Sequence, residues 1–178
     1  PQDERDLVDL AAAEGERFAT DTLAAGTGVS RMQLLKRLRG IEQTHQLITT
    51  DEGGYRFAHG LIREVLLHAI PVELRREYHG MVAAHLKEAF RDRPSESGKV
   101  GYHLLERHRF DDALPSLTGA AGEARRLFLN DRALQYLAIS GVRHLEHLVE
   151  TDLRRFPRQR YMRFRGSVRR TVRLTIAR

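Results

Sequence analysis

The chain has 178 residues, which suffices for one medium domain or two small ones, and its 41% hydrophobic content can build a core. Because cysteine is absent, disulfides, thiolate zinc sites and cysteine nucleophiles are excluded. The net charge of +6 comes from the C-terminal end, since residues 151–178 hold ten arginines and one acid, whereas residues 1–150 hold 20 basic and 23 acidic residues.

No apolar run approaches the roughly 20 residues that a membrane-spanning helix needs. The N-terminus lacks the basic and then apolar layout of a signal peptide. We therefore expect a soluble, cytoplasmic protein without a membrane span. The chain begins without a methionine, which suggests a fragment of a longer protein.

Three helices are predicted before residue 47. The first has apolar residues at helical spacing from Leu7 and can end at Gly15, and a short second helix is expected over 21–25. Ser30 and Gln33 form a capping signature for the third helix, because the side chains of such a pair bond to backbone groups of the first turn. The apolar stripe of this third helix is expected to comprise Met32, Leu35, Leu38 and Ile41.

A β-hairpin is predicted next. Residues 47–50 are rich in β-branched side chains, residues 51–54 are a turn signal, and residues 55–57 predict the return strand. Three helices followed by a hairpin are the outline of a winged helix. We expect a winged-helix domain, with the helices that follow it, over residues 1–91.

Two further helices are predicted after the hairpin, separated by Pro71. The first is expected to face a core with Leu61, Ile62, Val65, Leu66 and Ala69. The second is expected over 72–90, with an apolar face of Leu74, Tyr78, Met81, Val82, His85, Leu86 and Ala89. The polar residues 92–98 are expected to be a linker, because they include proline and glycine.

Residues 99–150 are typical of stacked helical hairpins. The pattern D-x-A-L-x-x-L occurs at 111–117 and again at 131–137, an offset of helical length that suggests a tetratricopeptide-like array. The overall prediction is a mainly α protein. The arginine-rich tail, 151–178, fits a helix, a strand or an unstructured basic segment, and these alternatives stay open.

One place in the sequence points to a specific chemistry. His59 stands between the predicted return strand and an apolar-faced helix. A helix N-terminus has unpaired N–H groups and the positive end of the backbone dipole, and therefore it can hold an anion such as phosphate. The other interpretation is that His59 caps its helix or packs beneath the hairpin.

The segment Phe57-Ala58-His59-Gly60-Leu61-Ile62-Arg63-Glu64 resembles the winged-helix segment of signal-transduction ATPases with numerous domains, the STAND class of P-loop ATPases. Plant disease-resistance members read Met-His-Asp there, and bacterial members read Arg-x-Phe-x-His-x-Leu-Ile-Arg-Glu. Gly15 to Phe18 and Arg75-Arg76-Glu77-Tyr78-His79 resemble two further family motifs. The predicted hairpins stand where bacterial members carry tetratricopeptide-like repeats, so the resemblance covers roughly residues 7–150.

The resemblance implies that His59 contacts the β-phosphate of ADP in the resting full-length protein and loses this contact when ATP replaces ADP. Arg63 is implied as a supporting or interdomain contact. Gly60 stands where plant members have an aspartate, so that polar contact is missing. The implied partners are the protein's own nucleotide-binding domain and an effector domain, such as a cyclase, a protein kinase or a LuxR-type regulator. A protein or small-molecule signal would act on the repeats.

The chain itself lacks a nucleotide-binding core. A P-loop needs G-x-x-x-x-G-K-[ST], and none of the three lysines, Lys36, Lys87 and Lys99, fits that pattern. We therefore expect that this chain is not an enzyme and holds no cofactor, whereas ADP or ATP is expected in the full-length parent.

Two other functions remain as alternatives. A winged helix can place its third helix in the DNA major groove, and that helix carries Arg31, Lys36, Arg37 and Arg39, but the negative charge of residues 1–150 argues against nucleic acid. The other alternative is a non-enzymatic scaffold for protein interactions. Metal binding is not expected, because the histidine pairs 103/108 and 144/147 have no carboxylate arranged with them.

Overall fold

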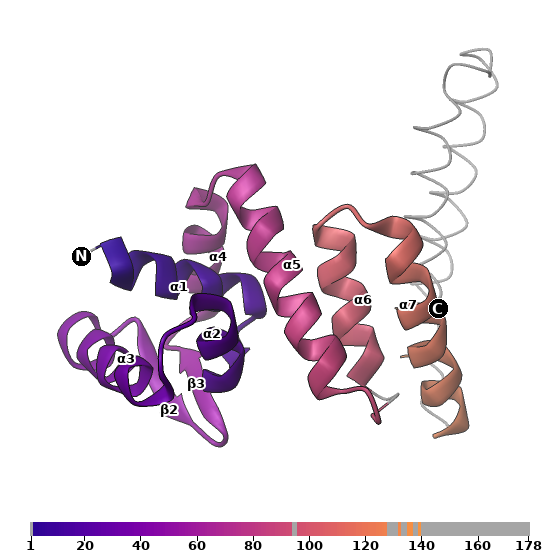
Figure 1. Ribbon diagram of the computed structural model, residues 1–178, viewed down its shortest axis with the longest axis horizontal. Helices are drawn as coiled ribbons and strands as arrows, with labels where there is room; N and C mark the ends of the chain where they lie inside the picture. Colours follow the sequence, from indigo (N-terminus) through magenta and orange to yellow (C-terminus); the bar gives the residue numbers. More distant parts are fainter. Residues whose placement is uncertain (1, 94–95, 128–131, 133–134, 137–138, 140–178) are drawn as a thin grey trace, which may run out of the picture. The chain divides into compact units, whose positions relative to one another are not determined.

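The computed structural model describes residues 2–93, 96–127, 132, 135–136 and 139. The chain divides into two compact units, residues 1–89 and 90–178. Over the described residues the protein is mainly helical with a small three-stranded antiparallel sheet (Figure 1), which confirms the prediction of a mainly α fold at this level. Whether the units are a winged helix and a tetratricopeptide-like array stays a prediction.

The first unit begins with α1 (Gln2–Glu14), α2 (Thr20–Thr27) and α3 (Arg31–His45). The capping prediction for α3 is confirmed for Ser30, whose hydroxyl accepts a hydrogen bond of 3.4 Å from the Gln33 N–H. The Gln33 side chain does not bond to the backbone as predicted, since its Oε1 accepts a hydrogen bond of 3.0 Å from the Ser30 hydroxyl. Gly28 ends α2 in the left-handed conformation with φ of 67°, where glycine carries no steric penalty.

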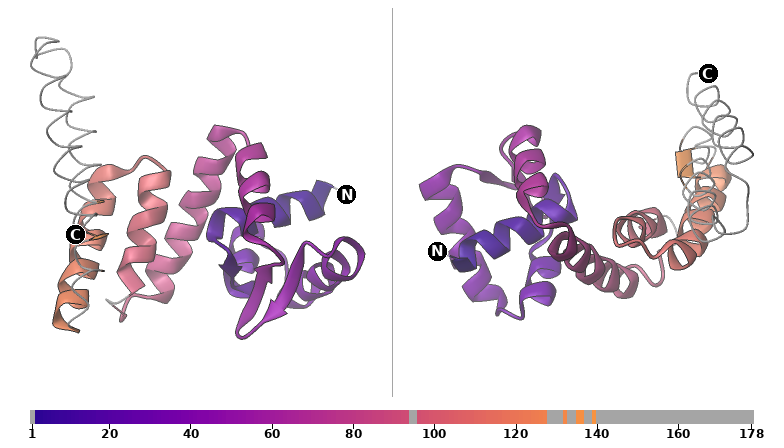
Figure 2. Two further views of the ribbon diagram at one scale, coloured as in Figure 1. Left: turned by 180° about the vertical axis from the view of Figure 1, so that it is seen from behind. Right: turned by 90° about the horizontal axis from the view of Figure 1, so that it is seen from above.

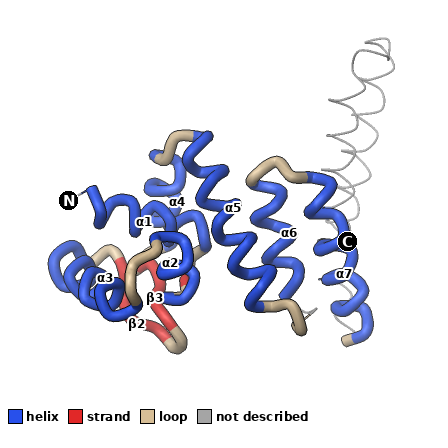
Figure 3. The backbone as a smooth tube through the Cα atoms, in the orientation of Figure 1, coloured by secondary structure: helices blue, strands red, loops and turns tan. Residues whose placement is uncertain are grey.

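The sheet contains the predicted hairpin, β2 (Ile48–Asp51) and β3 (Gly54–Phe57), and a short strand β1 (Arg17–Phe18) that the sequence analysis missed. The strand order is β1-β3-β2, all antiparallel (Figure 3). A Cβ atom at Gly54 would lie 2.5 Å from the Phe18 carbonyl oxygen, so glycine lets β3 approach β1 closely. Two residues are too short for any alternation, which is why β1 escaped prediction.

The sheet is followed by α4 (Gly60–Ala69) and α5 (Val72–Ala89), separated by Pro71 as predicted. Helices α1, α2, α3 and α5 and the sheet bury a common core. The largest fully buried apolar side chains of this unit are Leu10, Leu23, Leu34, Leu38, Ile41, Phe57 and Val82. Close packing of such residues supplies most of the stability of a small unit.

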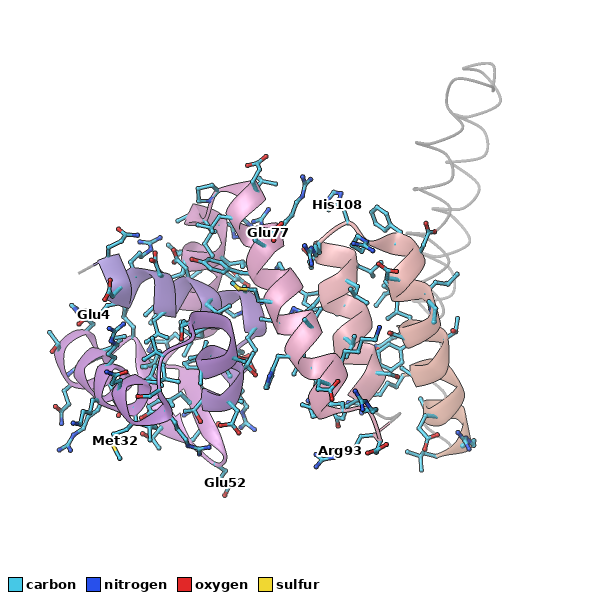
Figure 4. The ribbon with its side chains drawn as sticks, viewed as in Figure 1. Glu4, Met32, Glu52, Glu77, Arg93 and His108 are labelled. Carbon is cyan, nitrogen blue, oxygen red and sulfur yellow. The ribbon has the colours of Figure 1, made fainter. Side chains whose placement is uncertain are left out.

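Two predicted apolar faces need correction. In α3 the buried stripe is Leu34, Leu38 and Ile41, whereas Met32 is 65% exposed and projects from the helix (Figure 4), and Leu35 is only half-buried. The residues that face the core have the spacing i, i+4, i+7. The observed stripe therefore begins at Leu34, one residue before the predicted Leu35, and agrees with the prediction from Leu38 onward. In α5 the residues Leu74, Met81 and Ala89 are exposed, and the buried set is Tyr78, His79, Gly80, Val82, Ala83 and Leu86.

The described part of the second unit is a helical hairpin of α6 (Ser97–Glu106) and α7 (Phe110–Arg126), which lie side by side (Figure 2). The predicted linker, 92–98, therefore contains the first two residues of α6. The core of the hairpin is Leu105, Ala113 and Leu117. A Cβ atom at Gly101 would lie 2.6 Å from Leu117 Cγ, so glycine allows the two helices to approach closely.

The second predicted hairpin and the tail 151–178 lie almost wholly outside the described residues. The repeat copy at 111–117 is in α7, but most of the copy at 131–137 cannot be compared with it. None of the described helices combines the length and the apolar character needed to cross a bilayer.

Candidate functional site

His59 lies at the corner between β3 and α4, where it is the N-cap residue of α4. Its backbone is extended, with φ of −142° and ψ of 141°, and its carbonyl accepts a hydrogen bond of 3.0 Å from the Ile62 N–H. The side chain is exposed and makes no capping hydrogen bond. His59 therefore begins α4 through its backbone, whereas its side chain neither caps the helix with a hydrogen bond nor packs beneath the hairpin.

The backbone on either side of this corner is firmly held. The Phe57 N–H donates a hydrogen bond of 3.0 Å to the Glu16 carbonyl, and the Ala58 N–H donates one of 2.9 Å to the Leu47 carbonyl. The Phe57 ring is buried and lies 5.3 Å from the Phe18 ring, measured between centroids. The imidazole is thus carried on a rigid base while its own ring stays in solvent.

The face of α4 next to His59 is apolar but exposed. Leu61 is 69% and Val65 62% exposed, Ala69 is exposed as well, and no residue of α4 is buried. The prediction that these three side chains face a core is wrong. Helix α4 contacts the rest of its unit through Ile62, Leu66 and Leu67, which are half-buried, so the helix carries apolar residues on two sides and the unit covers only one.

Arg63 connects α4 to α1. Its Nε donates a hydrogen bond of 3.0 Å to the carbonyl oxygen of Ala12, in the last turn of α1. Carbonyls in that turn lack an intrahelical partner and carry the negative end of the helix dipole, which favours a guanidinium there. The structure thus gives Arg63 a contact within its own unit, and it shows no contact between Arg63 and His59.

A second histidine, which the sequence analysis assigned no role, lies in α5. His79 is only 1% exposed, and burial is the main cause that lowers its pKa to about 4, with the positive charges of Arg75 and Arg63 adding to the effect. The ring is therefore neutral at pH 7. Its position between the apolar residues Tyr78 and Val82 in the sequence of α5 was the signal from which the burial of His79 could have been predicted.

The basic residues of α3, candidates for DNA phosphates, are partly neutralised. Arg31 pairs with Asp21 at 2.7 Å, and Arg37 pairs with Asp3 at 3.2 Å. Lys36 and Arg39 are exposed and, among the residues that the structure describes, form no ion pair. Two separated unpaired cations on one helix could contact few phosphates, whereas binding to a polyanion such as DNA depends on many such contacts.

The histidine pairs give no metal centre within the described ranges. No group of three or more histidines, aspartates or glutamates there could hold a metal ion. His103 is buried in α6, His108 is in the middle of the loop between α6 and α7 with φ of 64°, and the pair 144/147 lies outside the described residues.

Comparison with known proteins assigns neither a family nor a function to this chain. The chain matches no family model, and neither a curated protein nor a solved structure is significantly similar to it.

Proposed function

We propose that this chain is a regulatory, non-catalytic part of a STAND-type ATPase. Residues 1–89 act as its winged helix and relay the state of a bound nucleotide, and the helical hairpins of the second unit are tetratricopeptide-like and receive a signal from a protein or a small molecule. The observation that carries the proposal is the exposed His59 at the N-terminus of α4, beside the exposed Leu61 and Val65.

The arrangement supports docking on a neighbouring domain for two reasons. An imidazole N–H at a helix N-terminus can donate to a phosphate oxygen, and the helix dipole favours the same anion. The apolar side chains of Leu61 and Val65, in the first and second turns of α4, supply area that water leaves on docking, at roughly 25 cal/mol per Å². A polar contact to the nucleotide and an apolar contact to the domain that holds it would thus be made by a single helix.

The test uses the full-length protein. Sequencing the gene upstream of residue 1 should reveal a P-loop. In that protein His59→Ala should abolish the ADP-dependent inhibition of the effector, whereas His45→Ala, an exposed histidine at the end of α3, should leave it unchanged. An absent P-loop, or inhibition that survives His59→Ala, would refute the proposal and favour a scaffold.

DNA binding remains the rival function, supported only by the free cations Lys36 and Arg39 on α3. The double variant Lys36→Gln/Arg39→Gln separates the two functions. If the chain binds duplex DNA, and both this double substitution and added salt lower the affinity, the result favours the alternative function of a DNA-binding transcriptional regulator. We expect no such salt-dependent complex.

A further inference from the structure

A groove of about 390 Å³ lies within the first unit, between α1, the end of α2, α3 and α5. Its volume falls within the roughly 300–1,000 Å³ of small-molecule sites. The proposed regulatory function makes no use of this groove, which is lined by other residues than those of the α4 corner.

The chemistry of the groove changes along α1. Four lining residues of this helix, Asp3, Asp6, Leu7 and Leu10, have the spacing i, i+3, i+4, i+7 and therefore form one stripe. The two acids occupy the first turns and are exposed, and the two leucines are buried deeper in the unit. The rim of the groove on α1 is thus acidic and its floor is apolar, and Arg37 of α3 is the one basic residue among those that line it.

The two carboxylates differ in their partners. Asp3 is paired with Arg37, whereas Asp6 accepts a hydrogen bond of 2.7 Å from the neutral Gln2 amide and forms no ion pair with any residue that the structure describes. The wall opposite α1 is supplied by Tyr78 and Met81 of α5. The pKa of the Tyr78 phenol is raised, first by burial and then by the charges of Asp6 and Asp9, so the negative charge acts on this wall.

We propose that this groove binds a small amphipathic organic cation, whose ammonium or guanidinium group pairs with Asp6 while its apolar body packs against the exposed Met81. A carboxylate without a cationic partner gains a charge-assisted hydrogen bond from such a ligand. The adjacent aromatic ring of Tyr78 also favours a cation over a neutral molecule of the same shape. An anion would meet the uncompensated charge of Asp6, and Arg37, the cation that lines the groove, is already paired with Asp3.

The probe for this site is phenethylamine, compared with phenethyl alcohol, which has the same apolar body and no charge. Each is titrated at pH 7 into the full 178-residue chain and followed by amide chemical shifts. The amine should give saturable shifts in residues 3–10 and 78–81, and the alcohol should bind about tenfold more weakly. Equal affinities, shifts elsewhere in the chain, or no saturation would overturn the proposal.

Two variants complete the test. Asp6→Asn keeps the shape of the side chain, and it should raise the dissociation constant of the amine about tenfold and leave that of the alcohol unchanged. Glu52→Gln removes one acid at the tip of the β2–β3 hairpin (Figure 4) and controls for net charge. An equal loss of amine affinity in both variants would show nonspecific charge attraction only. Since His59 belongs to neither variant, failure here leaves the proposed regulatory function untouched.

Discussion

A hydrogen bond of 3.0 Å from the Arg63 guanidinium to the Ala12 carbonyl joins α4 to α1, and these two residues are 51 positions apart in the sequence. Through this side-chain contact α4 is attached to the last turn of α1. Replacing Arg63 with methionine, which keeps the apolar stem, should lower the free energy of unfolding by about 1 kcal/mol.

Urea unfolding followed by circular dichroism measures this change. Arg56→Met is the matched control, because Arg56 lies exposed on β3 and its side chain forms no hydrogen bond or ion pair with the part of the chain that the structure describes. A loss for Arg56→Met equal to that for Arg63→Met would contradict a specific role for the contact with Ala12.

Because one face of α4 is exposed, we expect polar substitutions on this face to leave the stability of the protein nearly unchanged. The double variant Leu61→Ser/Val65→Ser should change the free energy of unfolding by less than about 0.5 kcal/mol, because both side chains are already in water. Leu34→Ala, at a fully buried position of α3, should cost about 2–5 kcal/mol. Thermal unfolding of the three proteins compares them directly, and a large loss in the α4 variant would mean that its face is covered in this chain.

The buried His79 predicts a loss of stability in mild acid. Its pKa in the folded protein is about 4, below the ordinary value of 6.5, so between these values the unfolded chain binds more protons than the folded one. The part of the free energy of unfolding that depends on a neutral His79 is complete above pH 6.5 and is lost as the pH falls toward 4. The total loss is at most about 3 kcal/mol.

Urea midpoints measured from pH 7 to pH 4.5 test this expectation. In His79→Gln, which cannot take up a proton, the decrease should become smaller, whereas His59→Gln, at an exposed side chain that makes no capping hydrogen bond, should follow the parent protein. If His79→Gln folds poorly, His79→Leu serves the same comparison. Identical pH profiles for parent and His79 variants would contradict the buried, neutral state of this ring.

Two glycines predict opposite effects of the same substitution. Gly54→Ala should destabilise the first unit, because the new Cβ would meet the Phe18 carbonyl at 2.5 Å. Gly40→Ala should stabilise it by up to about 1 kcal/mol, because Gly40 lies inside α3 and its Cβ would meet nothing within 4 Å. Differential scanning calorimetry should therefore place the two melting temperatures on opposite sides of the parent value.

Local signals in the sequence predicted local structure well. The Ser30 cap, the turn before Gly54 and the break at Pro71 are all governed by residues within a few positions, and the structure has each of them. The two-residue strand β1 was missed because its pairing with Tyr55 and Arg56 is a contact across 37 to 39 positions. No local pattern encodes such a contact.

Burial was harder to predict than helix formation. Leu61 and Val65 have the same spacing as core residues, and only the position of α4 at the edge of its unit leaves them in solvent. The candidate site was found from His59 because a strand-to-helix junction is visible in sequence. The groove was not, because its walls come from four helices whose packing the sequence does not reveal.

The uncovered face of α4 also separates two kinds of evolutionary constraint. Since burial places almost no demand on Leu61 and Val65, natural variants are free to carry any helix-compatible side chain there as far as the stability of this chain is concerned. Persistence of apolar residues at these two positions would consequently record selection for association alone, whereas persistence at Leu34 or Phe57 would not distinguish association from folding.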